Sequence, residues 1–162
     1  ELGDEDKALE YNQQYMDKNP NAAPTDFMKL AEIYVNKAKK DPAKKVENID
    51  KAIGVYAKLA EKYPTLKPFA KLQEGNTAFQ NELDDKAIAA YTEVINELEA
   101  KQCDEDELSY LKTSYQYMGF IYTYDKQDFD TAKPYWDKLL KLDPQNKLAN
   151  DAYEKAGLKP GE

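Results

Sequence analysis

Four stretches of fifteen residues in this 162-residue chain align without a gap. They read DKALEYNQQYMDKNP, DKAIGVYAKLAEKYP, DKAIAAYTEVINELE and DTAKPYWDKLLKLDP, at residues 6–20, 50–64, 85–99 and 130–144. Each stretch begins with Asp and has Ala at its third position, and three of the four end in Pro. Repetition at intervals of 35 to 45 residues is typical of chains in which short structural units stack on one another.

The repeated stretch has the pattern of a helix that packs closely against a neighbour. Its third-position alanines are Ala8, Ala52, Ala87 and Ala132. Four residues later come Asn12, Tyr56, Tyr91 and Trp136. Residues four apart share one helix face, so the small residue lets a second helix approach and the aromatic ring fills the space beside it. The final proline ends the helix, because it lacks the N–H that the next turn needs.

A second predicted helix precedes three of these stretches. The three segments are FMKLAEIY, LQEGNTAF and YQYMGFIY, at residues 27–34, 72–79 and 115–122. A small residue recurs at the same place in each: Ala31, Gly75 and Gly119. With the two helices in this order, the chain resembles the tetratricopeptide repeat family over nearly its whole length. It departs from the family pattern at Lys71 and Glu74, where the family has a large and an apolar residue, and at Asn12, where it has an aromatic one.

The resemblance implies an all-α fold, a right-handed solenoid of antiparallel helix pairs with about eight helices. One domain is expected over residues 1–162. Its expected parts are a half repeat at 1–20, repeats at 26–64, 68–99 and 109–144, and a capping helix at 146–157. A polar terminal helix of this kind covers the last apolar face of a solenoid.

Local signals predict where the helices begin. Asp41 and Pro42 have the chemistry of an N-cap and a first helical residue, and the carboxylates of DEDE at 104–107 favour a further helix start. Pro134 is expected near the start of its helix, where a missing N–H costs little. Residues 2–8 are expected to form the turn between two helices. The chain is therefore expected to be a piece of a longer protein, with the partner helix upstream.

The composition argues against most enzyme chemistry. All 23 basic residues are Lys, so the chain has neither His, the usual general acid or base and metal ligand, nor the bidentate fork of Arg. Cys103 is the only cysteine, and the chain has no His to activate it. The net charge of −8 disfavours binding to nucleic acids. We expect no catalysis, no metal and no cofactor. The sequence has no apolar run of the roughly 20 residues needed to span a bilayer.

Two charge runs are better explained as ordinary surface than as sites. The lysines of NKAKKDPAKK, at residues 36–45, could attract an anionic surface, but no aromatic residue is interleaved with them. A solvated corner between two helices is favoured. DEDE lacks the alternating ligands and the glycine of a calcium loop. Composition does not indicate a compartment.

The resemblance also implies where a partner binds. In the family, the first helix of each pair lines a concave groove that holds a peptide or protein segment. Alignment on Ala31, Gly75 and Gly119 places these residues in the groove: Glu32, Val35, Asn36, Phe69, Leu72, Asn76, Phe79, Gln80, Gln116, Phe120, Thr123 and Tyr124. Some members of the family hold the C-terminal carboxylate of a partner with Lys, Asn and Arg in the groove. Only Asn76 matches that set in this chain. The expected partner is a segment with apolar or aromatic residues, whose backbone bonds to the amides of Asn76, Gln80 and Gln116.

Other interpretations remain open at the level of the sequence. Phe79, Phe120 and Tyr124 could pack between successive repeats instead of facing a partner. The C-terminal helix or a neighbouring domain could fill the groove. The array could also be a spacer or self-association element of a larger scaffold or cell-envelope protein, with homo-oligomers forming through the unpaired N-terminal helix. An enzyme that acts on glycans through carboxylates has no support beyond the abundance of Asp and Glu.

Overall fold

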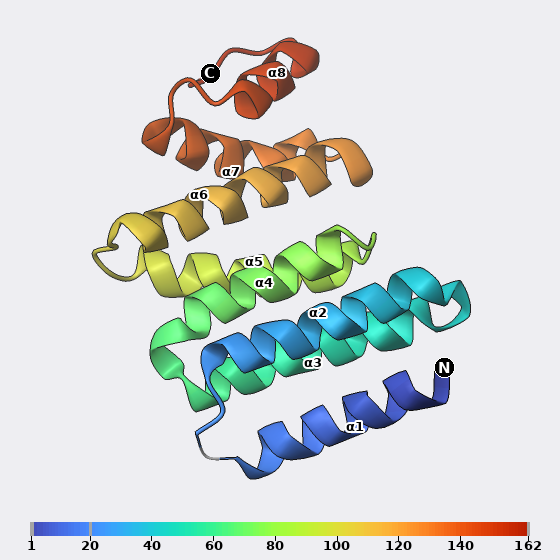
Figure 1. Ribbon diagram of the computed structural model, residues 1–162. Coiled ribbons are helices and arrows are strands. Elements are labelled where there is room, and N and C mark those ends of the chain that lie inside the picture. The colour runs from blue at the N-terminus through green and yellow to red at the C-terminus, as the bar shows by residue number, and fades with distance from the viewer. Residues whose placement is uncertain (1, 20, 162) are drawn as a thin grey trace. The chain divides into compact units, whose positions relative to one another are not determined.

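The computed structural model describes residues 2–19 and 21–161, without the side chains of residues 2–6, 8 and 17. The described part contains eight α-helices and no strand, which confirms the all-α prediction (Figure 1). They are α1 (Leu2–Lys18), α2 (Pro24–Lys40), α3 (Lys45–Lys62), α4 (Lys67–Phe79), α5 (Asp84–Glu99), α6 (Glu105–Phe120), α7 (Phe129–Leu142) and α8 (Lys147–Ala156). The Ala8 side chain and Pro20, both part of the repeat pattern, lie outside the described residues.

The chain forms two compact units, residues 1–87 and 88–162. In the first unit, α2 and α3 form an antiparallel hairpin, α1 packs against α2, and α4 packs against α3 (Figure 1). In the second unit, α6 and α7 form a hairpin and α8 packs against both. The division into repeats at 26–64, 68–99 and 109–144 within one domain stays a prediction.

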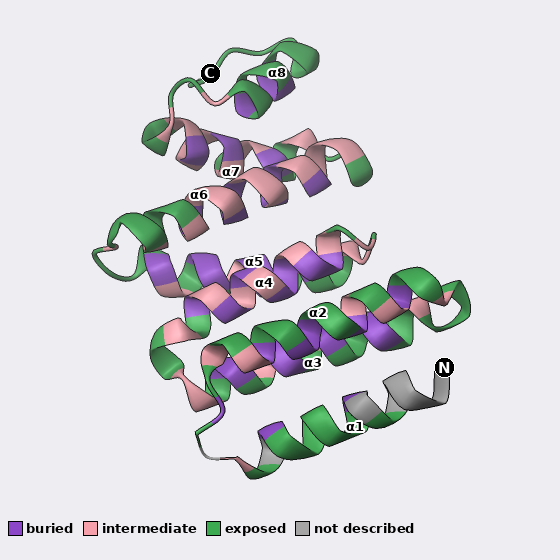
Figure 2. Ribbon diagram, viewed as in Figure 1, coloured by how far each residue is buried: buried purple, intermediate pink, exposed green. Residues whose placement is uncertain are grey.

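The core of the first unit confirms the close-packing role of the alanines. Ala31 of α2 and Ala52 of α3 are both 0% exposed, among the buried side chains of Phe27, Tyr34 and Leu59. The buried residues of each helix recur at the spacing of one face (Figure 2). Exposed faces carry the charges. The hairpin is therefore held by burial of apolar surface along one face of each helix.

In the second unit, a glycine packs tightly against a tryptophan. A Cβ atom added to Gly119 of α6 would lie 2.5 Å from the indole Cε2 of Trp136, a fully buried residue of α7. The indole Nε1–H also donates a hydrogen bond to Thr123 Oγ1, at 2.8 Å. The indole is therefore held by a hydrogen bond at its edge and by packing against Gly119 on one face. Ala87 and Ala132, from the other repeated stretches, are both 0% exposed.

Aromatic residues join α5 to α6 within the second unit. The rings of Tyr91 and Tyr117 stack with centroids 5.5 Å apart and planes 11° from parallel. Offset stacking of this kind adds about 0.5–1.5 kcal/mol to the free energy gained from burial.

A polar cluster also connects three helices of the second unit. Glu99 Oε1 accepts hydrogen bonds from the Tyr115 hydroxyl and from Lys138 Nζ, each at 2.6 Å. Burial works to raise the pKa of Glu99, but the bonds from Lys138 and Tyr115 outweigh it, and the pKa lies below its usual value. The folded state therefore favours the charged carboxylate.

Several predicted helix ends are confirmed. Asp104 caps α6, with its side chain accepting from Glu107 N at 2.9 Å while the Glu107 side chain bonds back to Asp104 N. Asp41 caps the 3₁₀ turn Pro42–Lys44 that leads into α3. Asn146 caps α8, and Gly157 ends it with a φ of +69°, a conformation that glycine adopts without strain.

Two expectations about local structure are wrong. Residues 2–8 form the first turns of α1 instead of a turn between helices. Gly3 is a poor helix former, but it lies in the first turn of the helix, and the acidic residues that follow suit a helix N-terminus. Pro134 lies inside α7, which begins at Phe129. Asp128 is the N-cap that fixes this start, because its side chain accepts hydrogen bonds from both Thr131 N and Thr131 Oγ1.

Two glycines that lie inside helices should respond in opposite directions to an added methyl group. Gly119→Ala pushes a Cβ into the Trp136 indole, which cannot shift freely, and should lower the free energy of unfolding by about 1–3 kcal/mol. Gly54→Ala is the matched control: no atom lies within 4 Å of the new Cβ, so the change should raise that free energy by about 0.5–1 kcal/mol. Urea unfolding followed by circular dichroism measures both. If both substitutions changed the free energy of unfolding by the same amount, the close contact between Gly119 and Trp136 would be contradicted.

Glu99→Gln should lower stability in a way that depends on pH. Because the folded-state pKa of Glu99 is lowered, its contribution is fully present above the unfolded pKa of about 4.5 and is lost as pH falls through the folded pKa. The wild type and the variant should differ by less than about 1 kcal/mol at neutral pH, since Glu99 is partly exposed, and should converge in acid. Denaturant melts at several pH values test this. A difference that persists in acid would show that the carboxylate charge is not the cause.

Candidate functional site

The predicted binding residues of α2 lie on its outer side. Glu32 and Asn36 are exposed, and Val35 is half-buried against the core of the first unit. Glu32 lies close enough to the buried Tyr56 of α3 to help raise the pKa of that phenol, although burial is the larger cause. A bond from the Thr77 side chain to Tyr56 opposes the shift. The α2 positions therefore present one carboxylate and one amide to solvent, beside apolar surface.

The predicted residues of α4 differ in exposure. Leu72 is 6% exposed, which leaves little of its side chain for a partner. Phe69 is half-buried against the same core as Val35. Asn76 and Phe79 are half-buried near the end of the helix, and Gln80 follows them as an exposed C-cap. The amide of Gln80 and part of the Phe79 ring are thus accessible at one end of α4.

In the second unit, the predicted residues contact other parts of the same chain. Gln116 Oε1 accepts a hydrogen bond from Asn146 Nδ2 at 3.4 Å. Thr123 accepts from Trp136, as described above. The rings of Phe120 and Tyr124 lie 4.8 Å apart and are tilted by 47°. All four residues are half-buried.

A π-helical turn explains where Thr123 points. Residues Ile121–Asp125 continue α6 with wider turns, and Lys126 N bonds to Ile121 O at 2.9 Å, five residues back. The groove positions were assigned with ordinary α-helical spacing, which no longer holds after residue 120. The wider turn brings the Thr123 hydroxyl to the Trp136 indole.

The C-terminal helix occupies part of the surface that α6 was expected to offer. Lys155 Nζ lies 4.7 Å from the centre of the Tyr124 ring, a cation–π contact. Burial, with a smaller contribution from the charge of Asp151, raises the pKa of Tyr124. The Asn146 bond to Gln116 is a second contact. Two predicted positions, Gln116 of α6 and Tyr124 of the π-helical turn, thus contact the N-cap and the body of the C-terminal helix, and coverage of a groove by this helix stays a prediction.

The α8 contact is anchored by a buried tyrosine. Tyr153 is 1% exposed, and its hydroxyl donates a short hydrogen bond to Asp137 of α7. Burial and this carboxylate both raise the pKa of Tyr153. The Phe129 ring packs edge-on against Tyr153, with centroids 5.5 Å apart. These contacts hold α8 against the α6–α7 hairpin.

The structure also contains a cleft that was not predicted. It lies in the first unit between α1, α2 and α3, and its lining includes Gly54. A glycine in the middle of a helix, where it costs about 1 kcal/mol relative to alanine, is the sequence signal that could have drawn attention to it.

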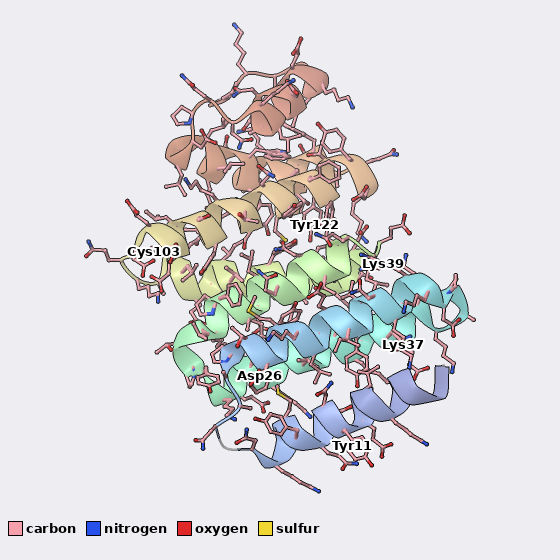
Figure 3. All side chains as sticks on the ribbon, viewed as in Figure 1. Tyr11, Asp26, Lys37, Lys39, Cys103 and Tyr122 are labelled. Atoms are coloured by element: carbon pink, nitrogen blue, oxygen red, sulfur yellow. The ribbon has the colours of Figure 1, made fainter. Side chains whose placement is uncertain are left out.

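The titratable side chains of the described residues form no metal-binding cluster. Among the described residues, no cluster of three or more Cys, Asp or Glu side chains is placed to hold a metal ion. Cys103 lies in the connection between α5 and α6 (Figure 3). Burial, with a smaller contribution from the charge of Glu107, raises the pKa of its thiol, so the thiol stays protonated at neutral pH and is a weak nucleophile. None of the described helices combines the length and the apolar composition needed to cross a bilayer.

Comparison with known proteins finds a family model that matches part of the chain. The model of the tetratricopeptide repeat matches residues 27–65. The matched residues contain the α2–α3 hairpin and with it both close-packed alanines, Ala31 and Ala52. No curated protein matches the chain.

Proposed function

We propose that this chain, which contains a tetratricopeptide repeat at residues 27–65, is a non-enzymatic module. It would bind a protein or peptide segment along the first helix of each helix pair. Tetratricopeptide repeats generally mediate protein–protein interactions, and the family is typically non-enzymatic. The observation that carries the proposal is the matched α2–α3 hairpin, whose buried faces leave the outer side of α2 to solvent.

The binding residues would be those that the fold leaves accessible. Glu32 and Asn36 are one helical turn apart on α2, so a partner segment that crosses the helix can reach both. The exposed Gln80 would bond to the backbone of the segment, and the accessible part of Phe79 would receive an apolar or aromatic side chain.

The mechanism would be preorganisation. The helices that carry these residues are fixed by the packing of their opposite faces, so binding orders the partner much more than the module. The surface is rich in hydrogen-bonding groups and poor in large apolar area. Its affinity would therefore depend on shape and on a few well-placed contacts.

The test is affinity capture from the source cells with three forms of the protein. A triple variant, Glu32→Ala with Asn36→Ala and Gln80→Ala, changes exposed residues only and should lose most of the captured partner. The matched control is Glu61→Ala with Asn96→Ala, at exposed positions of α3 and α5. It should capture the same proteins as wild type. Both variants should melt within a few degrees of wild type, because exposed substitutions rarely change stability by more than about 0.5 kcal/mol.

The proposal fails if the triple variant captures the partner as well as wild type does. It also fails if the control on α3 and α5 loses the partner to the same extent.

A second candidate function, self-association through the N-terminal helix, is favoured by the exposure of apolar side chains there. Tyr11 and Tyr15 of α1 are 72% and 55% exposed, and Tyr11 extends from the helix (Figure 3). Tyr15 also lines a shallow cleft with Ile33 of α2, itself 39% exposed. Exposed apolar residues gathered in one place are typical of surfaces that pair with another protein.

If the chain self-associates in this way, its mass should rise with concentration. Light scattering should then give a monomer for Tyr11→Ser with Tyr15→Ser at concentrations where wild type forms dimers. Leu148→Ser on α8, which removes an apolar side chain that is 37% exposed, is the control and should dimerise like wild type. A wild-type protein that stays monomeric at every concentration would exclude this candidate.

A further inference from the structure

The unpredicted cleft of the first unit has a volume of about 150 Å³. Its apolar walls come from three helices: Met16 of α1, Phe27 and Leu30 of α2, and Val55 of α3. The Tyr34 hydroxyl donates a hydrogen bond to Gln13 Oε1 at 2.7 Å, which ties α1 to α2 across the cleft. The walls are therefore held in place without an occupant.

Gly54 keeps the cleft open. It lies in the middle of α3 and is exposed, and among the described residues no side chain or other helix comes within 4 Å of where its Cβ would be. Trp136 packs against Gly119, whereas no described side chain packs against Gly54. A glycine in a helix interior costs stability relative to alanine, and it permits a close approach by another molecule.

The charged side chains that line the cleft are lysines. Of the described residues that line it, Lys51 and Lys58 of α3 are the charged ones, in a chain whose net charge is −8. Lys51 Nζ donates a hydrogen bond to Glu47 Oε1 at 2.5 Å. Both partners of that pair are about half exposed, so the pair is weak and can be exchanged for another carboxylate. The local charge favours an anionic occupant.

We propose that this cleft binds the side chain of a phenylalanine from an acidic segment of another polypeptide. An apolar cavity of about 150 Å³ accepts a benzene molecule, so the volume suits one phenyl ring. Carboxylates on either side of the phenylalanine would reach Lys51 and Lys58, which are two helical turns apart. The close approach over Gly54 would let the backbone of the segment lie against α3.

The cleft is separate from the surface under the proposed function. On α2, Leu30 and Tyr34 line the cleft, whereas Glu32 and Asn36 lie two residues further along, about 200° around the helix axis. The two surfaces therefore lie on opposite sides of α2. Either can fail without the other.

The experiment titrates the ¹⁵N-labelled protein with short synthetic peptides and follows the backbone amide resonances of Gly54 and Val55. The first peptide has one phenylalanine flanked by Asp and Glu. Two matched peptides have serine in place of the phenylalanine, or lysines in place of the acids. The first peptide should shift both resonances with a dissociation constant in the millimolar range or tighter, and the two matched peptides should not. Added salt should weaken the binding.

Variants of the protein separate the two parts of the site. Gly54→Leu fills the cleft and should weaken binding at least about tenfold, while Gly54→Ala, which leaves most of the space open, should weaken it less. Lys51→Gln with Lys58→Gln should weaken binding about fivefold, in line with the loss of two exposed ion pairs. Melting curves establish that each variant is folded.

Four outcomes would overturn the proposal. The serine peptide could bind as well as the phenylalanine peptide, or Gly54→Leu could leave the affinity unchanged. Toluene could bind as tightly as the acidic peptide and with no effect of the lysine changes, which would make the cleft a site for small apolar molecules. The Gly54 resonance could shift with protein concentration alone, which would make a second copy of the chain the occupant.

Discussion

Close approach of helices at a few small residues is the constraint on which both units depend. Gly119 lies against the Trp136 indole with no room for a Cβ, and Ala31 and Ala52 are fully buried where α2 meets α3. Protein interiors are packed as densely as organic crystals, so these contacts fix how each hairpin closes. A hairpin that closed less tightly would expose the faces that now form the core.

This packing also decides what is left for recognition. The aromatic residues of the repeat pattern are used inside the units, where Trp136 and Tyr91 are fully buried. The outer side of α2 keeps a carboxylate and an amide, and α4 keeps an amide and part of a phenyl ring. A surface of this kind recognises a partner through a small number of directed contacts, and large-scale apolar burial contributes less.

Two glycines inside helices, Gly54 of α3 and Gly119 of α6, contribute to the structure in opposite ways. Gly119 leaves room for the Trp136 indole, whereas Gly54 lines a cleft that the described residues leave open. The sequence places Gly119 at the small-residue position of the repeat pattern, but it does not show that Trp136 packs there or that a cleft opens beside Gly54. The difference depends on which side chain the neighbouring helix brings to that point.

The sequence by itself determined the helices, most of their ends and the burial of the repeated alanines. These features follow from local chemistry: a small residue one turn before an aromatic, a carboxylate at Asp104, and a glycine at 157. Only the tertiary structure decided that Thr123 turns to Trp136, that Asn146 bonds to Gln116 while Lys155 of α8 contacts Tyr124, and that a cleft opens beside Gly54. Each of these depends on groups that are distant along the chain, and a pattern of spacings within one helix does not specify what a second helix places against it.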